Sequence, residues 1–80
     1  MVISPNNSII INESAGICRI TFNRPKILNA INFDMAIALQ KVAEDISVDK
    51  KIRVVILDGS GDHFMAGGDI KSFKTFLDKK

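Results

Sequence analysis

Apolar residues recur at helical spacing in the middle of this 80-residue chain, and this pattern constrains the fold more than any other feature. Four of them follow one another at intervals of four, three and four residues, which places them on one face of a helix. Polar residues fall largely on the opposite face, and Asn32 is a suitable N-cap. The pattern therefore predicts an amphipathic helix over residues 33–47 that packs against a sheet. The apolar residues of this stripe are Met35, Leu39, Val42 and Ile46.

Short segments typical of β-strands lie on both sides of this helix. Residues 8–13 are rich in isoleucine, and residues 17–22 alternate between apolar and polar side chains, as half-buried strands do. The turn-forming residues 14–16 between them predict a hairpin. After the helix, residues 53–58 contain a continuous apolar run, which we expect to be a strand buried on both faces. A strand, a helix and a strand in this order predict a crossover between parallel strands, and hence an α/β fold.

Two adjacent glycines, Gly67 and Gly68, precede a second helical pattern. Apolar residues within 70–77 keep helical spacing, and Asp69 is placed as the N-cap of this short C-terminal helix. Backbone N–H groups at the start of a helix have no intrahelical partner, so they can bind an anion or stabilise a developing oxyanion. Glycine also allows a ligand to approach the backbone closely. The other interpretation of this segment is a tight turn that leads into the helix.

The composition argues against several functional classes. The net charge is only +2, the basic residues are scattered, and five phenylalanines are the only aromatic residues, so nucleic-acid binding is disfavoured. Cys18 is the only cysteine and lies in an apolar segment, which predicts a buried, unreactive thiol in a reducing compartment. The first twenty residues lack a secretion signal, and the apolar runs are too short to cross a bilayer. We therefore expect a cytoplasmic protein that binds no metal, membrane or nucleic acid.

Common nucleotide-binding and catalytic motifs do not fit the sequence. Phe64 occupies the position of the third glycine of a dinucleotide-binding fingerprint, and no glycine is followed by the Lys-Ser or Lys-Thr pair of a P-loop. His63 is the only histidine and lies in a polar loop, so we expect it to be solvated. The nine carboxylates show no spacing that singles out an acid–base pair. These patterns alone therefore assign no reaction.

Two segments of the chain resemble the signatures of a known family. Residues 20–31 read ITFNRPKILNAI and contain NRP followed by LNA. Residues 54–61 read VVILDGSG, and residues 64–71 read FMAGGDIK. In this order the segments resemble the two N-terminal signatures of the crotonase superfamily, the enoyl-CoA hydratase/isomerase relatives. The pair is more specific than either signature alone, and the resemblance covers residues 9–73.

This resemblance implies a single partial domain over residues 1–80, the N-terminal part of a crotonase-like ββα spiral that assembles as trimers or paired trimers. It also implies acyl-CoA thioester substrates, with coenzyme A as part of the substrate and no separate cofactor. Gly68 would donate one of two backbone N–H groups to the thioester oxygen; alanine is frequent there, and glycine keeps the N–H. Asp69 would aim the helix rather than act as a base. The residues implied to contact CoA or substrate are Lys26, Ile27, Leu28, Ala66, Gly68, Asp69, Ile70 and Lys71.

The resemblance also implies what these residues do not supply. The second oxyanion donor and the acid–base carboxylates of such enzymes lie further along the chain than residue 80, so the 80 residues alone are expected to be inactive. The parent protein is expected to hydrate 2-enoyl-CoA, although isomerases, CoA hydrolases and decarboxylases of the superfamily share the same motifs. An alternative from another class is a catalytically inactive module that binds CoA or self-associates. The missing phosphate fingerprint argues against a third alternative, a fragment of a nucleotide-binding fold.

Overall fold

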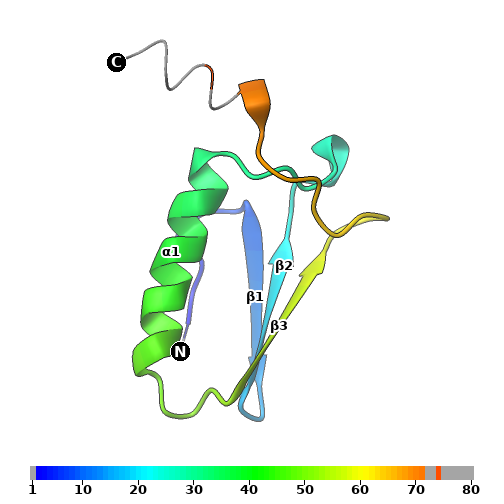
Figure 1. Ribbon diagram of the computed structural model, residues 1–80. Coiled ribbons are helices and arrows are strands. Elements are labelled where there is room, and N and C mark those ends of the chain that lie inside the picture. Colours follow the sequence, from blue (N-terminus) through cyan, green and yellow to red (C-terminus); the bar gives the residue numbers. More distant parts are fainter. Residues whose placement is uncertain (1, 72–73, 75–80) are drawn as a thin grey trace.

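The computed structural model describes residues 2–71 and 74, and it shows one long helix packed against one face of a three-stranded sheet (Figure 1). The predicted hairpin, helix and third strand are all present, with ends within one residue of those predicted. Ile70, Lys71 and Lys74 are helical, and the rest of the helix predicted over 70–77 lies outside the described residues. The main elements are β1 (Ile9–Ser14), β2 (Ile17–Phe22), the 3-10 helix η1 (Pro25–Ile27), α1 (Phe33–Val48) and β3 (Val54–Gly59).

The strands are arranged in the order β1-β2-β3. β1 and β2 pair antiparallel, with Ser14 opposite Ile17 and a two-residue turn between them. Ala15 and Gly16 have positive φ angles of 52° and 80°, which is the conformation that a two-residue hairpin turn of this type requires. β2 and β3 pair parallel. The predicted crossover through α1 is therefore confirmed.

The core lies between α1 and the β1–β2 hairpin. Asn32 caps α1, as predicted, because its side-chain oxygen accepts a hydrogen bond from the Met35 N–H at 2.9 Å. Burial raises the pKa of the Cys18 thiol, and the charges of Glu13 and Asp49 add to this effect, so the thiol stays neutral. This agrees with the expected unreactive cysteine. The buried apolar residues are Val2, Ile9, Cys18, Ile20, Phe22, Met35, Ala38 and Val42, with Leu39 and Ile46 packed against them.

The third strand differs from the prediction of burial on both faces. Val54, Val55 and Leu57 are 50%, 43% and 50% exposed. The reason is that β3 is an edge of the sheet, and α1 packs over β1 and β2 rather than over β3 (Figure 1). No described strand pairs with the outer edge of β3. The apolar sequence of β3 therefore calls for more covering surface than the described residues provide.

Candidate functional site

The two signature segments meet beyond the carboxyl ends of β2 and β3, where residues 23–31 and 60–69 form adjoining loops (Figure 1). Backbone hydrogen bonds join these loops directly, and the pair Ile31–Gly68 forms an isolated parallel bridge. Segments far apart in the sequence thus build one surface at this end of the sheet. The bonds run from the N–H of Ala66 to the carbonyl of Leu28 (3.0 Å), from Ile31 to Gly67 (2.7 Å) and from Asp69 to Ile31 (2.7 Å).

Asn29 holds the two loops together from inside. Its side chain is completely buried, and its backbone has a positive φ of 56°, a conformation that asparagine tolerates better than most residues. The side-chain oxygen accepts a hydrogen bond from the Arg24 N–H at 2.8 Å. The side-chain nitrogen donates to the carbonyl oxygens of Ser60 at 3.0 Å and His63 at 2.8 Å. One amide group therefore joins the first signature segment to the loop that follows β3.

Gly59, the last residue of β3, is required for this close approach. A Cβ atom at this position would lie 2.3 Å from the carbonyl oxygen of His63 and 2.4 Å from that of Phe64. The Phe64 ring then packs on Phe22 with a centroid distance of 5.4 Å and an interplanar angle of 54°. The side chain of His63 is exposed, as expected for a solvated loop residue, and its carbonyl group is the part used in the loop.

The predicted donor at Gly68 is left free by this arrangement. The Gly67 N–H points to the Met65 sulfur at 2.9 Å, and the Asp69 N–H is used in the bond to Ile31. Gly68 itself is exposed, and its N–H forms no hydrogen bond within the part of the chain that the structure describes. Gly67 has a φ of 105°, which residues with a side chain rarely adopt. An exposed residue whose N–H has no partner among the described residues therefore lies at the predicted position.

The residues expected to contact CoA lie around the same loops. Lys26 and Ile27 belong to η1, and Leu28 follows with a left-handed φ of 58°. Residues 23–27 line a surface hollow of about 440 Å³. Ala66 lies beside Leu28 through their hydrogen bond, and both are exposed. The structure thus brings the predicted residues of both signatures to one end of the sheet. The remaining ones, Asp69, Ile70 and Lys71, continue directly from Gly68 into the following helical residues.

Arg24 connects the same two segments through its side chain. One guanidinium nitrogen donates to the Ala30 carbonyl at 2.6 Å, and another pairs with the Asp69 carboxylate at 3.2 Å. Neither Arg24 nor Asn29 was predicted to have a role beyond its place in the signature. Their position was the only indication of such a role, because a charged side chain and an amide side chain lie in a short loop that also contains the apolar Ile27 and Leu28.

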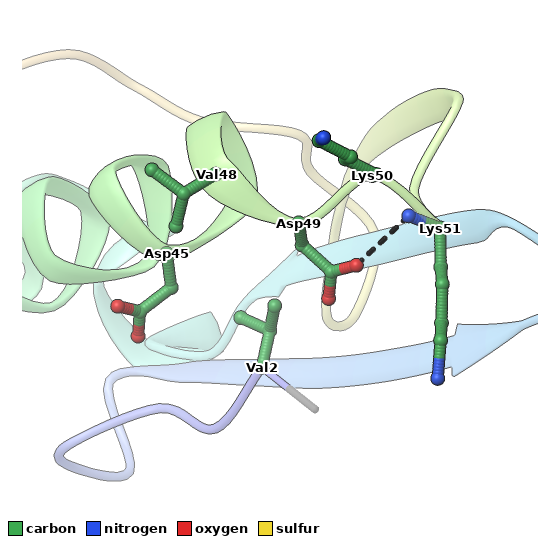
Figure 2. Close-up of a pocket in the computed structure, with 6 residues that line it drawn as sticks. All are labelled: Val2, Asp45, Val48, Asp49, Lys50 and Lys51. Atoms are coloured by element: carbon green, nitrogen blue, oxygen red, sulfur yellow. Dashed lines mark hydrogen bonds between the residues drawn. The ribbon is translucent and has the colours of Figure 1, made fainter.

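A larger hollow lies elsewhere, at the C-terminal end of α1 (Figure 2), with a volume of about 530 Å³. It contains none of the predicted site residues, and its charged groups are of both signs. One hydrogen bond joins its walls, from the Lys51 N–H to the Asp49 carboxylate at 2.9 Å. Because it lacks the free donor and the glycines, we place the functional site at the loops despite their smaller hollow. The lining residues are Val2, Asp45, Val48, Asp49, Lys50 and Lys51.

Two features are absent from the described residues. These residues contain no group of three or more histidine, cysteine, aspartate or glutamate side chains that could hold a metal ion. None of their helices combines the length and the apolar character needed to cross a membrane.

The chain matches the family model described as enoyl-CoA hydratase/isomerase over residues 12–77. The end of β1, the whole of β2, the crossover helix and the two loops all fall within this match. The chain belongs to the enoyl-CoA hydratase/isomerase family, of which it corresponds to the N-terminal part. The resemblance to the crotonase superfamily is thereby confirmed.

Individual relatives agree with this assignment. The chain is 41% identical over 68 residues to a probable peroxisomal enoyl-CoA hydratase 1 of Arabidopsis thaliana, covering 85% of this chain and 26% of the relative. It is 38% identical over 69 residues to the small ribosomal subunit protein mS47 of Schizosaccharomyces pombe, covering 86% of this chain and 16% of the relative. The solved structure of Pseudomonas aeruginosa AtuE superimposes with a TM-score of 0.85 at 32% identity, over 92% of this chain and 29% of that one. The chain thus spans about a quarter or less of the two curated relatives.

Proposed function

We propose that these residues form the first part of an acyl-CoA site, in which Gly68 donates its backbone N–H to the thioester carbonyl oxygen. Lys26, Ile27, Leu28 and Ala66 would hold the CoA portion beside it, with Asp69, Ile70 and Lys71 continuing along the substrate. The observation that carries the proposal is that Gly68 is exposed and its N–H has no hydrogen-bond partner among the described residues, within loops that are otherwise joined by hydrogen bonds. In the whole protein, the reaction proposed is the hydration of a 2-enoyl-CoA.

The chemistry follows from what a fixed N–H donor does to a thioester. Addition of water to the double bond of an enoyl thioester, or loss of an α-proton, moves negative charge onto the carbonyl oxygen. A preorganised donor stabilises that charge, and such donors typically lower the barrier by about 3–4 kcal/mol each. The carboxylate of Asp69 is paired with Arg24, so it is poorly suited to act as a base. We place the second donor and the acid–base groups in the larger part of the relatives' length that this chain does not span.

A catalytically inactive CoA-binding or self-associating module is the second candidate. It is favoured by the match to a relative whose name is that of a ribosomal subunit protein and by the exposed apolar edge of β3. Isomerase, CoA hydrolase and decarboxylase activities remain alternatives within the family. For the whole protein we further propose a homo-oligomer, a trimer or hexamer, in the cytoplasm.

Titration of the ¹⁵N-labelled chain with CoA and with crotonyl-CoA tests the proposal. We expect weak binding in which the amide resonances of residues 26–28 and Ala66 shift with both ligands, whereas that of Gly68 shifts strongly only with crotonyl-CoA. The variant Gly68→Pro, which has no N–H, should lose the preference for crotonyl-CoA, and Gly68→Ala, which keeps the N–H, should retain it. Saturation with crotonyl-CoA that leaves the Gly68 resonance unchanged would refute the donor role.

The same sample tests the expected inactivity of the 80 residues. General acid–base catalysis is usually worth 10²–10⁴-fold, and loss of one oxyanion donor costs about 10²–10³-fold more. We therefore expect no hydration of crotonyl-CoA above a heat-denatured control. Measurable hydration would show that an acid–base residue lies among those assigned here to the surface, such as Glu44, Asp62 or His63.

A further inference from the structure

Arg24 is the only arginine whose side chain joins both signature loops among the described residues, and the proposed CoA contacts give it no role. Its guanidinium lies 2.6 Å from the Ala30 carbonyl oxygen and 3.2 Å from a carboxylate oxygen of Asp69. The side chains of Arg24 and Asp69 are only 20% and 19% exposed. Screening by water is weaker at such a site than on the surface, so this pair is better placed to restrain the loops than an exposed pair.

The two groups that Arg24 binds flank the backbone bridge between the loops. Ala30 precedes Ile31, Asp69 follows Gly68, and Ile31 and Gly68 are the two members of the bridge. A guanidinium can hold both groups at once, because its N–H donors form a rigid, planar fork, which the single ammonium of a lysine lacks. Arg24 therefore adds a side-chain restraint to the loop that the backbone bonds of Ile31 already hold.

The loop has little stiffness of its own. Gly67 and Gly68 have no side chains to pack, and glycine populates more backbone conformations than any other residue. The direction of the Gly68 N–H must therefore be set by contacts on either side of it. The backbone bonds of Ile31 hold Gly67 before it and Asp69 after it, and Arg24 holds the carboxylate of Asp69 as well.

We propose that Arg24 is a positioning residue, which fixes Asp69 relative to Ala30 and thereby keeps the Gly68 N–H free and directed outward for a substrate carbonyl. The identity of the ligand rests on the proposed function, whereas the restraint of the loop by Arg24 can be measured in the chain without ligand. The two can therefore fail separately.

The test compares Arg24→Met with Arg19→Met. Arg19 also pairs with an aspartate, Asp58, at 2.6 Å, but its side chain is 48% exposed. Both residues of this pair lie in strands, outside the loops formed by residues 23–31 and 60–69. The first measurement is the hydrogen exchange of the Ile31 and Asp69 amides in the free chain. The second is the ratio of the affinities for crotonyl-CoA and CoA, because only crotonyl-CoA has a thioester carbonyl for Gly68 to bind.

We expect Arg24→Met to speed the exchange of both amides and to lower the affinity ratio by about three- to tenfold, the range expected for one hydrogen bond. Arg24→Lys should give intermediate values, since it can hold one of the two groups, and Arg19→Met should change neither measurement. A folded Arg24→Met chain with unaltered amide exchange and an unaltered Gly68 resonance overturns the proposal.

Two further outcomes are also decisive. If Arg24→Met does not fold, Arg24→Lys replaces it, and values equal to those of the unaltered chain would overturn the positioning role. If the unaltered chain binds crotonyl-CoA no better than CoA while amide exchange still depends on Arg24, the proposed donor role of Gly68 fails and the restraint by Arg24 is supported.

Discussion

At the loop end of the sheet, buried polar groups of one signature segment are matched by groups of the other. Asn29 is fully buried and makes three hydrogen bonds, and among the described residues no buried side-chain nitrogen or oxygen lacks a partner. In β3, by contrast, the described residues leave apolar side chains uncovered and one strand edge unpaired. Val54, Val55 and Leu57 are about half exposed, and the strand edge is unpaired within the described part of the chain.

Two requirements that are usually met together, the pairing of buried polar groups and the covering of apolar surface, are therefore separated in this structure. The hydrogen bonds that join the two loops are made between residues 23–31 and 60–69, all of which this chain contains. β3 needs apolar surface from elsewhere, either from the remaining length of a relative-sized protein or from another copy. Site geometry and the covering of the sheet can therefore be tested independently. Single substitutions at the loop end should change the free energy of unfolding, whereas substitutions in β3 should change the association between chains.

The largest effect is expected at Gly59. In Gly59→Ala the added Cβ would lie within 2.4 Å of two backbone carbonyl oxygens, so the loop after β3 must move. We expect a loss of about 3 kcal/mol or more in the free energy of unfolding, at the upper end for overpacking. Urea denaturation measures it. Gly67→Ala is the matched control, because its Cβ would meet nothing within 4 Å and the strain comes only from φ; we expect about 1 kcal/mol there. Equal losses in the two variants would contradict the close approach at Gly59.

Asn29 should come next. Asn29→Ala removes the partner of the Arg24 N–H and of two carbonyl groups, in a site that water does not reach. We expect a loss of about 2–4 kcal/mol, since each buried group left without a partner costs about 1–3 kcal/mol and carbonyls can adjust in part. Asn29→Gly loses the same bonds but relieves the positive φ, so it should be less destabilised by up to about 1 kcal/mol. A loss below 1 kcal/mol in Asn29→Ala would show that the loops are held by their backbone bonds alone.

The sequence predicted the strands and α1 because their signals are local. The 4-3-4 stripe of α1, the alternation in β2 and the Asn32 cap each depend on neighbouring residues, and all three are observed. The burial of β3 was predicted wrongly because burial depends on which surfaces are present, and an apolar run carries no information about that. At the site, the donor role of Gly68 was implied by the family resemblance and stays a prediction, because the paired glycines alone are equally consistent with a tight turn. The linking roles of Arg24 and Asn29 were not predicted, because their partners in the second loop lie 31 to 45 residues away.

The outer side of β3 should reveal itself in association rather than in stability. We expect the 80-residue chain to self-associate at high concentration, through the unpaired edge and its apolar side chains. Val55→Lys should shift sedimentation towards the monomer, because a charge on an edge strand opposes pairing. It should change the free energy of unfolding by only about 0.5 kcal/mol, as is usual for exposed positions. Ile37→Lys, which alters a 58% exposed residue on α1, is the control and should leave association unchanged. A compact monomer of the unaltered chain at high concentration would argue against this role of β3.

The smallest effect is expected at Asp58, on the sheet face away from α1. A hydrogen bond from the Thr21 hydroxyl, at 2.6 Å, is the main cause that lowers the pKa of Asp58, and the Arg19 guanidinium adds to it. Because the pKa is lower in the folded chain than in the unfolded one, the folded state gains stability above the ordinary carboxyl pKa of about 4. That gain is lost as the pH falls through the lowered pKa.

The difference in unfolding free energy between the unaltered chain and Asp58→Asn should therefore be constant near neutral pH and shrink in acid. It should also be small and reduced by salt, because the Asp58 side chain is 39% exposed, about twice as much as that of Asp69. Thr21→Val should raise the pKa of Asp58 towards its ordinary value in an NMR titration. If the pKa of Asp58 does not move in Thr21→Val, the Thr21 hydroxyl is not the main cause of the lowered pKa. The comparison of this exposed pair with the shielded pair of Arg24 and Asp69 would then depend on the effect of Arg19 alone.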